Sequence, residues 1–498
     1  MAAVEIAFGL IFDPYVLMVI LLAASFGLFM GAIPGLSATM ATALLVPVTF
    51  FMEPVPALAA IVTATAMAIF AGDLPGALLR IPGTPASAAY SGEAHAMTRK
   101  GNAELALGVG LSSAVVGGIF GSIVLATSAP VLADIALRFS SFEYFWLACL
   151  GLTCAAFIAS GDPLKGVVSL LIGLLIATIG LDPVSGHPRF TFGFVDLMGG
   201  INFISAMIGM FAVAEVIRTV TTVGRPEEIL QQRVGNIFKG LGGVLYRYKV
   251  NLLRGSIIGT GVGALPGAGS DIAAWISYGV SRRFSRQPEK FGTGHVEGIV
   301  DAGASNNAGL GGAWVPTLVF GIPGDSITAI VIGVLYMKGM NPGPTVFLYQ
   351  PELIYAVFLA FFLANLMLLP LGFIAIRSAK QLLRVPREIL MPIILMFCIV
   401  GTFAINNTVF DVGVMLVLGV MAYVMEENDF PVAPAILGLV LGPLLQETFM
   451  TSMIKAGGNL LAFFDRPIAA ALGVITVSIW VSPFLMRLYR HMRKSEYQ

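Results

Sequence analysis

Apolar runs long enough to cross a lipid bilayer recur along almost the whole of this 498-residue sequence. A helix needs about 20 mostly apolar residues to cross a hydrocarbon core that is about 30 Å thick. Only 11% of the residues are Asp, Glu, Lys or Arg, against about 25% in soluble domains. The chain therefore has too little polar surface to cover a water-exposed globule. We expect an all-α polytopic membrane protein, and the composition excludes a soluble enzyme, a nucleic-acid-binding protein and a disordered scaffold. The runs lie at about 14–33, 54–72, 103–128, 142–160, 163–181, 199–219, 252–280, 311–337, 352–376, 389–406, 409–426, 431–447 and 467–487.

Glycine and proline are frequent, with 57 and 28 residues respectively, which is high for simple helices. In a bilayer, broken backbone is tolerated only where it is buried in protein or lines a polar cavity. Two shorter apolar pieces, at 36–51 and 322–335, adjoin such Gly/Pro breaks. The sequence therefore predicts about twelve membrane elements, including Pro-Gly-broken helices or re-entrant hairpins.

A polar stretch at 221–254 separates the apolar runs into two series. Its apolar residues recur at three- and four-residue spacing between basic ones, a pattern that favours an amphipathic helix in the headgroup plane. A soluble loop helix packed on the protein is the alternative. We expect a first membrane repeat at 1–220, this linker at 221–254, a second membrane repeat at 255–487 and a basic tail at 488–498. The apolar residues of the linker pattern are Leu230, Val234, Phe238, Leu241 and Leu245.

Basic residues cluster in short segments between the apolar runs, at 99–100, 225–254, 282–286, 377–387 and in the tail. Lys and Arg are enriched in cytoplasmic loops. All these clusters are cytoplasmic if the N-terminus is periplasmic, the C-terminus is cytoplasmic and the number of crossings is odd. Arg138 and Lys338 would then be two exceptions.

Three motifs of the first half recur in the second half in the same order, which indicates an internal duplication. Because the first half starts outside and the second inside, we expect two inverted repeats. Broken helices in such repeats expose half-helix N-termini, with their positive partial charge, to an anionic substrate. The alternative is that these glycines only permit close helix packing. The pairs are Gly31-Ala-Ile-Pro-Gly35-Leu-Ser-Ala with Gly263-Ala-Leu-Pro-Gly267-Ala-Gly-Ser, Ile81-Pro-Gly-Thr84-Pro-Ala-Ser87 with Ile322-Pro-Gly-Asp325-Ser-Ile-Thr328, and Met97-Thr-Arg-Lys-Gly-Asn102 with Met337-Lys-Gly-Met-Asn341.

With these motifs the sequence resembles the large membrane subunit of tripartite tricarboxylate transporters, the TctA family, over essentially the whole chain. The resemblance implies a substrate-translocating subunit in the bacterial inner membrane that imports tricarboxylates or dicarboxylates. It implies two partners, a small membrane subunit of about four spans and a periplasmic substrate-binding protein. It also implies coupling to a Na⁺ or H⁺ gradient, with no cofactor other than Na⁺ as a coupling ion. The lack of a Gly-x-x-x-x-Gly-Lys-Ser/Thr phosphate loop agrees with gradient coupling. The runs that carry the resemblance are Gly31–Pro47, Gly72–Ala88, Gly263–Ala273 and Gly311–Gly333.

Polar residues and Pro-Gly breaks inside the apolar runs are the candidate site, because burying polar groups in a membrane is expensive. For a single Ser or Thr, a hydrogen bond to a carbonyl one turn back is the alternative role. We expect Asp73, Asp271 and Asp325 to bind the coupling ion. The expected substrate-binding residues are Pro34, Gly35, Ser37, Thr39, Arg80, Pro82, Gly83, Thr84, Ser87, Pro266, Gly267, Ser270, Asn306, Asn307, Pro323, Gly324, Ser326 and Thr328.

Two of these candidates have specific alternatives. Arg80 is either a bidentate clamp for a substrate carboxylate or the ion-pair partner of Asp73. Asp271 either binds a cation or caps the half-helix that follows it. The second half has Asp271 and Asp325 where the first has threonines, which favours the second half for ion coupling.

Other chemistry is poorly supported by the sequence. His95 and His295 are better explained as loop residues than as proton relays. The three cysteines lie in apolar runs and indicate neither a disulfide framework nor a metal site. No nucleophile–base pair or His-Glu-x-x-His motif supports an intramembrane enzyme, so we expect no enzymatic activity. A stand-alone carboxylate symporter or exchanger without a binding protein remains the alternative function.

Overall fold

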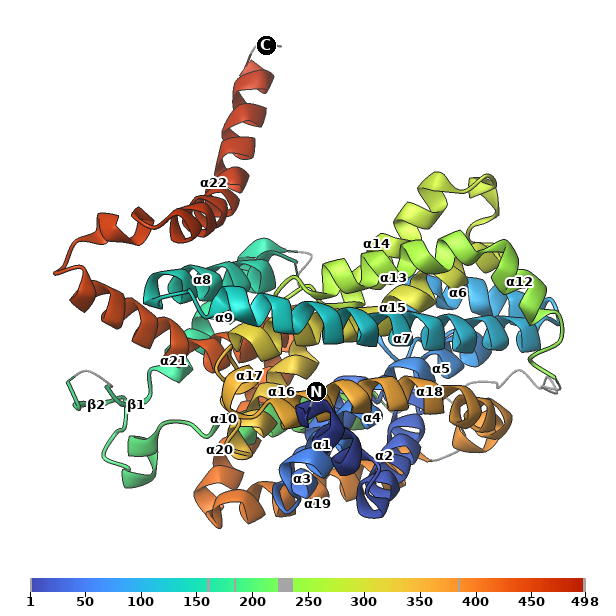
Figure 1. Cartoon of the computed structure of the whole chain (residues 1–498), viewed down its shortest axis with the longest axis horizontal. Helices are drawn as coiled ribbons and strands as arrows, with labels where there is room; N and C mark the ends of the chain where they lie inside the picture. Colours follow the sequence, from blue (N-terminus) through green and yellow to red (C-terminus); the bar gives the residue numbers. More distant parts are fainter. Residues whose placement is uncertain (1, 159–161, 183–184, 223–235, 384–385, 496–498) are drawn as a thin grey trace.

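A computed structural model of the chain describes residues 2–158, 162–182, 185–222, 236–383 and 386–495 (Figure 1). In these residues nearly all regular structure is helical, and the one sheet is a short antiparallel pair, β1 (Gly180–Leu181) with β2 (Pro188–Arg189). Eight helical segments of the described chain are long and apolar enough to cross a membrane, and five shorter apolar helices accompany them. The architecture agrees with the expected all-α polytopic membrane protein, while the count of about twelve membrane elements stays a prediction.

The helices of the first half follow the expected apolar runs closely. The run expected at 199–219 is one helix with a π-helical segment, η2, in its middle. The elements are α1 (Ala2–Ile11), α2 (Pro14–Ala32), α3 (Ala38–Phe50), α4 (Pro54–Ala71), α5 (Asp73–Leu79), α6 (Pro85–Arg99), α7 (Ala103–Ala136), α8 (Ser141–Ile158), α9 (Pro163–Ala177), η1 (Val195–Gly199), α10 (Phe203–Met207), η2 (Ile208–Val213) and α11 (Ala214–Thr222).

In the second half, two expected continuous runs are broken. The run at 252–280 is α13 and α14 with a Pro-Gly break between them, and the run at 311–337 is α15 and α16. The residues of these breaks are themselves mostly apolar, so mean hydropathy does not detect the breaks. Each run therefore reads as one continuous apolar segment although the structure divides it into two helices. The elements are α12 (Leu241–Arg247), α13 (Lys249–Gly263), α14 (Gly269–Phe284), η3 (Pro288–Lys290), α15 (Val296–Phe320), α16 (Ser326–Met337), α17 (Val346–Tyr349), α18 (Pro351–Leu382), α19 (Arg387–Asn406), α20 (Val409–Glu427), α21 (Val432–Lys455), η4 (Leu460–Phe464) and α22 (Pro467–Ser495).

The linker pattern lies only partly within the described chain. Leu230 and Val234 are outside the described residues. The described remainder forms the short helix α12, and α13 begins at Lys249, inside the expected linker. Residues 249–254 are therefore part of a helix that packs against α15 and α14. The segment boundaries otherwise stay predictions.

The two halves use the same backbone hydrogen bonds in their breaks. The helix before each Ile-Pro-Gly motif ends in a left-handed residue, Arg80 with φ 65° and Gly321 with φ 68°. The left-handed residue donates its N–H to the carbonyl four residues before it. The residue after it donates its N–H to the carbonyl six residues before that residue, and the two bonds together are the Schellman ending of a helix. The duplication and the inversion of the halves both stay predictions. The equivalent pairs are Arg80–Gly76 and Gly321–Thr317 at 3.2 Å, and Ile81–Pro75 and Ile322–Pro316 at 3.3 Å.

Glycines on α2 and α13 let each helix approach its neighbour backbone to backbone. A Cβ on Gly27 or Gly31 would lie 2.2–2.3 Å from a carbonyl oxygen of α4. A Cβ on Gly255 or Gly263 of α13 would lie 2.3 Å from one of α15. These contacts leave no room for any side chain, so part of the glycine content serves close helix packing.

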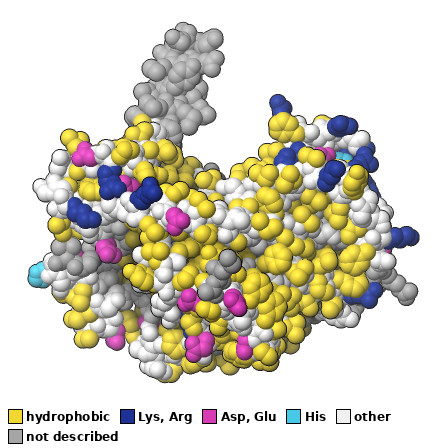
Figure 2. Space-filling model, in the orientation of Figure 1, with side chains coloured by type: hydrophobic (Ala, Val, Ile, Leu, Met, Phe, Trp, Pro, Cys, Tyr) yellow, Lys and Arg dark blue, Asp and Glu magenta, His cyan; other side chains and the backbone are white. Residues whose placement is uncertain are grey.

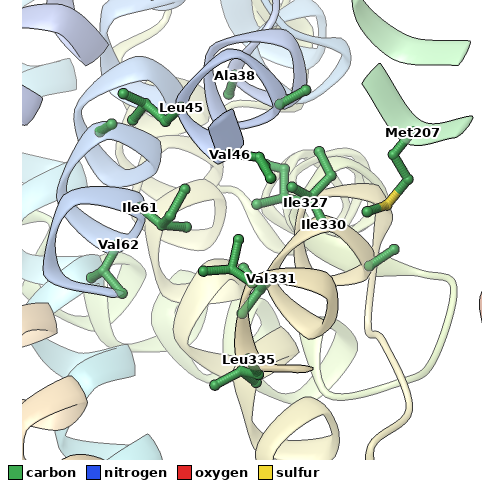
Figure 3. Close-up of a cluster of buried hydrophobic side chains, with 14 of the residues drawn as sticks. Ala38, Leu45, Val46, Ile61, Val62, Met207, Ile327, Ile330, Val331 and Leu335 are labelled. Carbon is green, nitrogen blue, oxygen red and sulfur yellow. The ribbon is translucent and has the colours of Figure 1, made fainter. Parts of the chain in front are cut away.

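Helix α16 lies in the middle of the larger hydrophobic core. Figure 3 shows its residues Ile327, Ile330 and Val331 facing Val46 of α3 and Ile61 of α4. This packing fixes the position of α16, and with it the N-terminus that follows the second Pro-Gly break. A short helix of twelve residues is stabilised mainly by such tertiary contacts.

Charged side chains are distributed unevenly over the surface. In Figure 2, apolar side chains cover most of the face shown, and many Lys and Arg side chains gather at the end where Figure 1 labels α6, α12 and α14. A smaller basic group lies at the opposite end. The expected orientation of the chain in the membrane stays a prediction.

Candidate functional site

Five helices begin at one cavity of about 640 Å³, which we call the central cavity. Four of them, α3, α6, α14 and α16, each follow one of the Pro-Gly breaks, and the fifth is α21. Motifs that are more than 200 residues apart in the sequence therefore lie side by side. The sequence-predicted residues that line the cavity are Gly35, Ser37, Thr39, Pro82, Gly83 and Thr84 from the first half, and Gly267, Asp271, Asp325 and Ser326 from the second.

Two of the four helices begin with the same capping box. Thr84 Oγ1 accepts the N–H of Ser87 at 3.1 Å, and Ser87 Oγ accepts the N–H of Thr84 at 3.1 Å. Asp325 and Thr328 exchange the equivalent bonds at 2.8 Å. Asp325 is thus the N-cap of α16, a role that sequence reasoning did not assign to it.

The carboxylates of the second half also contact helices other than their own. Asp271 lies in the first turn of α14, and its Oδ1 accepts the N–H of Ala86 in α6 at 3.1 Å. The expected alternative, in which Asp271 caps its own half-helix, is therefore wrong for this structure. Trp275, one turn further on, donates its Nε1–H to the carbonyl of Pro85 at 3.1 Å. Asp325 in turn accepts the N–H of Ser270 at the start of α14.

Three charged residues of the central cavity were missed by the sequence reasoning. Arg218 forms ion pairs with Glu215 on α11 and, at 3.5 Å, with Glu426 on α20. Arg218 is the one basic residue among the described residues that line the cavity. Its position as a charged residue inside the apolar run at 199–219 is the sequence signal that marks it.

Arg80, the expected carboxylate clamp, does not line the central cavity. Its side chain is exposed at the end of α5, and in the described chain it forms no ion pair with Asp73. Asp73 instead accepts the hydroxyl of Tyr90 at 2.6 Å. The expected ion pair with Asp73 is therefore wrong for this structure, and the role of Arg80 as a carboxylate clamp stays a prediction.

Most of the remaining candidates lie outside the cavity lining, and one residue of the lining, Gly83, is closely packed against Gly72. Asn306 and Asn307 are buried in the middle of α15. Gly83 donates its N–H to the carbonyl of Gly72 at 3.0 Å, and a Cβ on Gly83 would lie 2.6 Å from the Gly72 Cα. At Gly83, close packing accounts for the glycine. The candidates outside the cavity lining are Pro34, Arg80, Ser87, Pro266, Ser270, Asn306, Asn307, Pro323, Gly324, Thr328 and Asp73.

A second cavity of about 570 Å³, the outer cavity, lies between α9, α16, α21 and the hairpin region. It shares α16 and α21 with the central cavity but uses their later turns. Arg189 and Tyr336 line it, and Arg189 donates to Gln446 Oε1 at 3.1 Å. Across the described residues, no group of three or more His, Cys, Asp or Glu side chains could hold a metal ion.

The charge balance of the central cavity is acidic. Its lining contains four carboxylates and one guanidinium. Each helix N-terminus contributes a partial positive charge of about half an elementary charge. An anion is therefore attracted by the backbone and by Arg218, and repelled by the carboxylates unless a cation or proton accompanies it.

Broken membrane helices whose N-termini meet at a polar cavity are the architecture of secondary transporters. The sequence model described as the Tripartite tricarboxylate transporter TctA family matches residues 17–437, and the chain belongs to this family. It is a multi-pass membrane component of a tripartite transporter family.

Two similar proteins come from Agrobacterium vitis. One, described as an uncharacterized 52.8 kDa protein in the TAR-I ttuC' 3'region, is 34% identical over 446 residues, covering 90% of this chain and 88% of the relative. The other, an uncharacterized protein in the TAR-II ttuC' 3'region, is 35% identical over 228 residues, covering 45% of this chain and 94% of the relative. No solved structure matches the chain.

Proposed function

We propose that the chain is the large, substrate-translocating subunit of a binding-protein-dependent secondary transporter that imports tricarboxylates or dicarboxylates. A Na⁺ or H⁺ gradient drives the import. The partners are a small membrane subunit and a periplasmic substrate-binding protein. The complex lies in the bacterial inner membrane, with the N-terminus of this chain periplasmic and the C-terminus cytoplasmic. Family membership and the central cavity support this proposal.

The convergence of four helix N-termini beside Arg218 is the observation that carries the proposal. Helix N-termini bind anions because their first N–H groups point outward and carry positive partial charge. A substrate with two or three carboxylates needs several such donors at once. Arg218 adds a planar guanidinium that suits a carboxylate, and the hydroxyls of Ser37, Thr39 and Ser326, which also line the cavity, add neutral donors.

The acidic side chains provide a physical reason for cation coupling. Asp271 accepts a hydrogen bond from the N–H of Ala86 at the N-terminus of α6. A substrate carboxylate needs a backbone donor of this kind. We propose that Na⁺ or a proton neutralises Asp271 or Asp325 and so releases these backbone donors to the substrate. The substrate and the cation then bind together, because each lowers the electrostatic cost of the other.

Uptake by the purified complex in proteoliposomes tests this function. A panel of labelled di- and tricarboxylates is offered with imposed Na⁺ or H⁺ gradients, with and without the binding protein. We expect gradient-dependent uptake that falls at least about tenfold in Arg218→Gln, the loss expected when one charged hydrogen bond worth about 1.5–3 kcal/mol is removed. Arg80→Gln, the matched control at an exposed arginine outside the cavity, retains uptake.

The outcomes separate the alternatives. Equal uptake without the binding protein would identify a stand-alone symporter or exchanger. Loss of uptake in Arg80→Gln together with normal uptake in Arg218→Gln would contradict the assignment of the central cavity.

A further inference from the structure

A buried carboxyl group lies behind α6, outside the central cavity. Asp73 is the first residue of α5 and is 9% exposed. Helix α6 separates the two sites: Thr84, Pro85 and Ala88 line the central cavity, whereas later residues of the same helix, including Tyr90, line a much smaller cavity with Asp73.

Both halves of the chain contribute to the surroundings of Asp73. Tyr90 donates its hydroxyl to Asp73 Oδ1 at 2.6 Å, and Asn306 of α15 donates to the Tyr90 oxygen at 3.2 Å. In the described chain, no Lys, Arg or His forms an ion pair with Asp73. An ionised carboxylate in this position would be a buried charge with one neutral donor, which is costly in an apolar core.

The other titratable groups on the helices packed against α5 are directed elsewhere. Glu93 on α6 accepts the Tyr278 hydroxyl at 2.7 Å and the N–H groups of Gly294 and His295. His95 Nδ1 lies 3.3 Å from the carbonyl of Ala77, one turn further along α5. The remaining charged groups at these helices are Arg80 at the end of α5, Arg99 at the end of α6, and Glu104 and Asp134 on α7; none of them lines the cavity beside Asp73.

The small cavity beside Asp73 has a volume of about 10 Å³, close to the lower limit for one water molecule. A hydrated cation does not fit there. The neighbouring core of α15 and α7 contains buried polar atoms that have no hydrogen-bond partner among the described residues, namely Asn306 Oδ1, both side-chain polar atoms of Asn307, Ser305 Oγ and Ser113 Oγ. Buried polar atoms of this kind are commonly satisfied by ordered water.

We propose that the Asp73 carboxyl group, held by Tyr90 and Asn306, is a proton-binding site distinct from the central cavity. Asp73 Oδ1 accepts the Tyr90 hydroxyl, and one proton adds to Oδ2 to give the neutral acid. One carboxyl oxygen suffices for a proton, whereas a metal cation needs a shell of several oxygens. Helix α6 lines both this site and the central cavity, so proton binding can affect the substrate site. This role in transport rests on the proposed function. Proton binding itself does not rest on it.

Infrared difference spectroscopy between about pH 5 and about pH 9, a range that spans perturbed carboxyl groups, tests proton binding without any transport. The purified chain in nanodiscs is compared with Asp73→Asn, Tyr90→Phe and the exposed control Asp134→Asn. We expect a carbonyl-stretch band of a protonated carboxyl group that is lost in Asp73→Asn and retained in Asp134→Asn. In Tyr90→Phe the band should shift to higher frequency, because the carbonyl oxygen loses its hydrogen bond.

Identical carboxyl bands in the wild type and in Asp73→Asn would overturn the proposal. If Asp73→Asn does not fold, an unshifted band in Tyr90→Phe would overturn it. In the reconstituted complex, Asp73→Asn should lose uptake driven by a pH gradient while still binding substrate. If the wild-type complex binds no carboxylate substrate, the proposed function is refuted, whereas the spectroscopic evidence for proton binding at Asp73 is unaffected.

Discussion

Replacing Asp325 separates a structural role of this carboxylate from a role in ion coupling. Asp325 caps α16 through the N–H of Thr328 at 2.8 Å and also accepts the N–H of Ser270 at the start of α14. Loss of an N-cap side chain costs about 1 kcal/mol. A buried donor left without an acceptor costs about 1–3 kcal/mol. We therefore expect Asp325→Ala to lower the free energy of unfolding by about 2–4 kcal/mol in total.

The first half of the chain supplies the matched variant. Thr84 occupies the equivalent position and forms the same capping box. Asp325→Thr therefore keeps the cap and loses the charge and the bond to Ser270, so its loss should be smaller than that of Asp325→Ala by about 1 kcal/mol. Titration with SDS in mixed micelles, followed by tryptophan fluorescence, measures both variants. Equal losses in the two variants would refute the capping argument.

A role of Asp325 in ion coupling is tested by measuring uptake rather than stability. If the charge of Asp325 or Asp271 binds the coupling ion, Asp325→Asn and Asp271→Asn should weaken the dependence of uptake on Na⁺ concentration or pH. Normal ion dependence in both variants would leave Asp325 with its capping role and Asp271 with its bond to Ala86 alone.

Three further predictions concern the breaks and the orientation. Gly35 and Gly267 both have positive φ, but a Cβ on Gly35 would make only an ordinary contact with Thr219 Oγ1 at 3.8 Å, whereas one on Gly267 would lie 2.5 Å from the Ala155 Cα. Gly35→Ala should therefore cost about 1–2 kcal/mol of backbone strain and Gly267→Ala considerably more; similar losses on unfolding in micelles would contradict this. Arg80→Gly should raise the free energy of unfolding by about 1 kcal/mol, because a left-handed non-glycine residue is strained. The variant should also retain uptake, and a loss of uptake would instead support Arg80 as a ligand of a substrate carboxylate. Cysteine-accessibility labelling should place the two termini on opposite sides of the membrane, and labelling from the same side would contradict the odd number of crossings and the inverted repeats together.

The architecture was predictable where a local rule decides it. Apolar length identifies the membrane helices, and the Pro-Gly motifs identify the breaks, including those that hydropathy alone conceals at 252–280 and 311–337. Repetition of the motifs indicated which segments belong to one site. The structure brings Ser37, Thr84 and Asp325 to the same cavity.

The rest of the site depends on tertiary packing that no local pattern contains. Asp271 bonds to Ala86, which is 185 positions away in the sequence. Arg80 was favoured by its residue type, but its side chain is exposed at the end of α5 and does not line the cavity. Arg218 became identifiable as a site residue only when α11 and α20 were seen to meet there.

The central claim is that carboxylates bind where the four helix N-termini meet. A cryo-electron microscopy structure of the transporter complex with a bound tricarboxylate tests it most directly. We predict density for the substrate among the first turns of α3, α6, α14 and α16, within hydrogen-bond distance of Arg218. Density confined to the outer cavity beside Arg189 and Tyr336, with the central cavity empty, would contradict the claim.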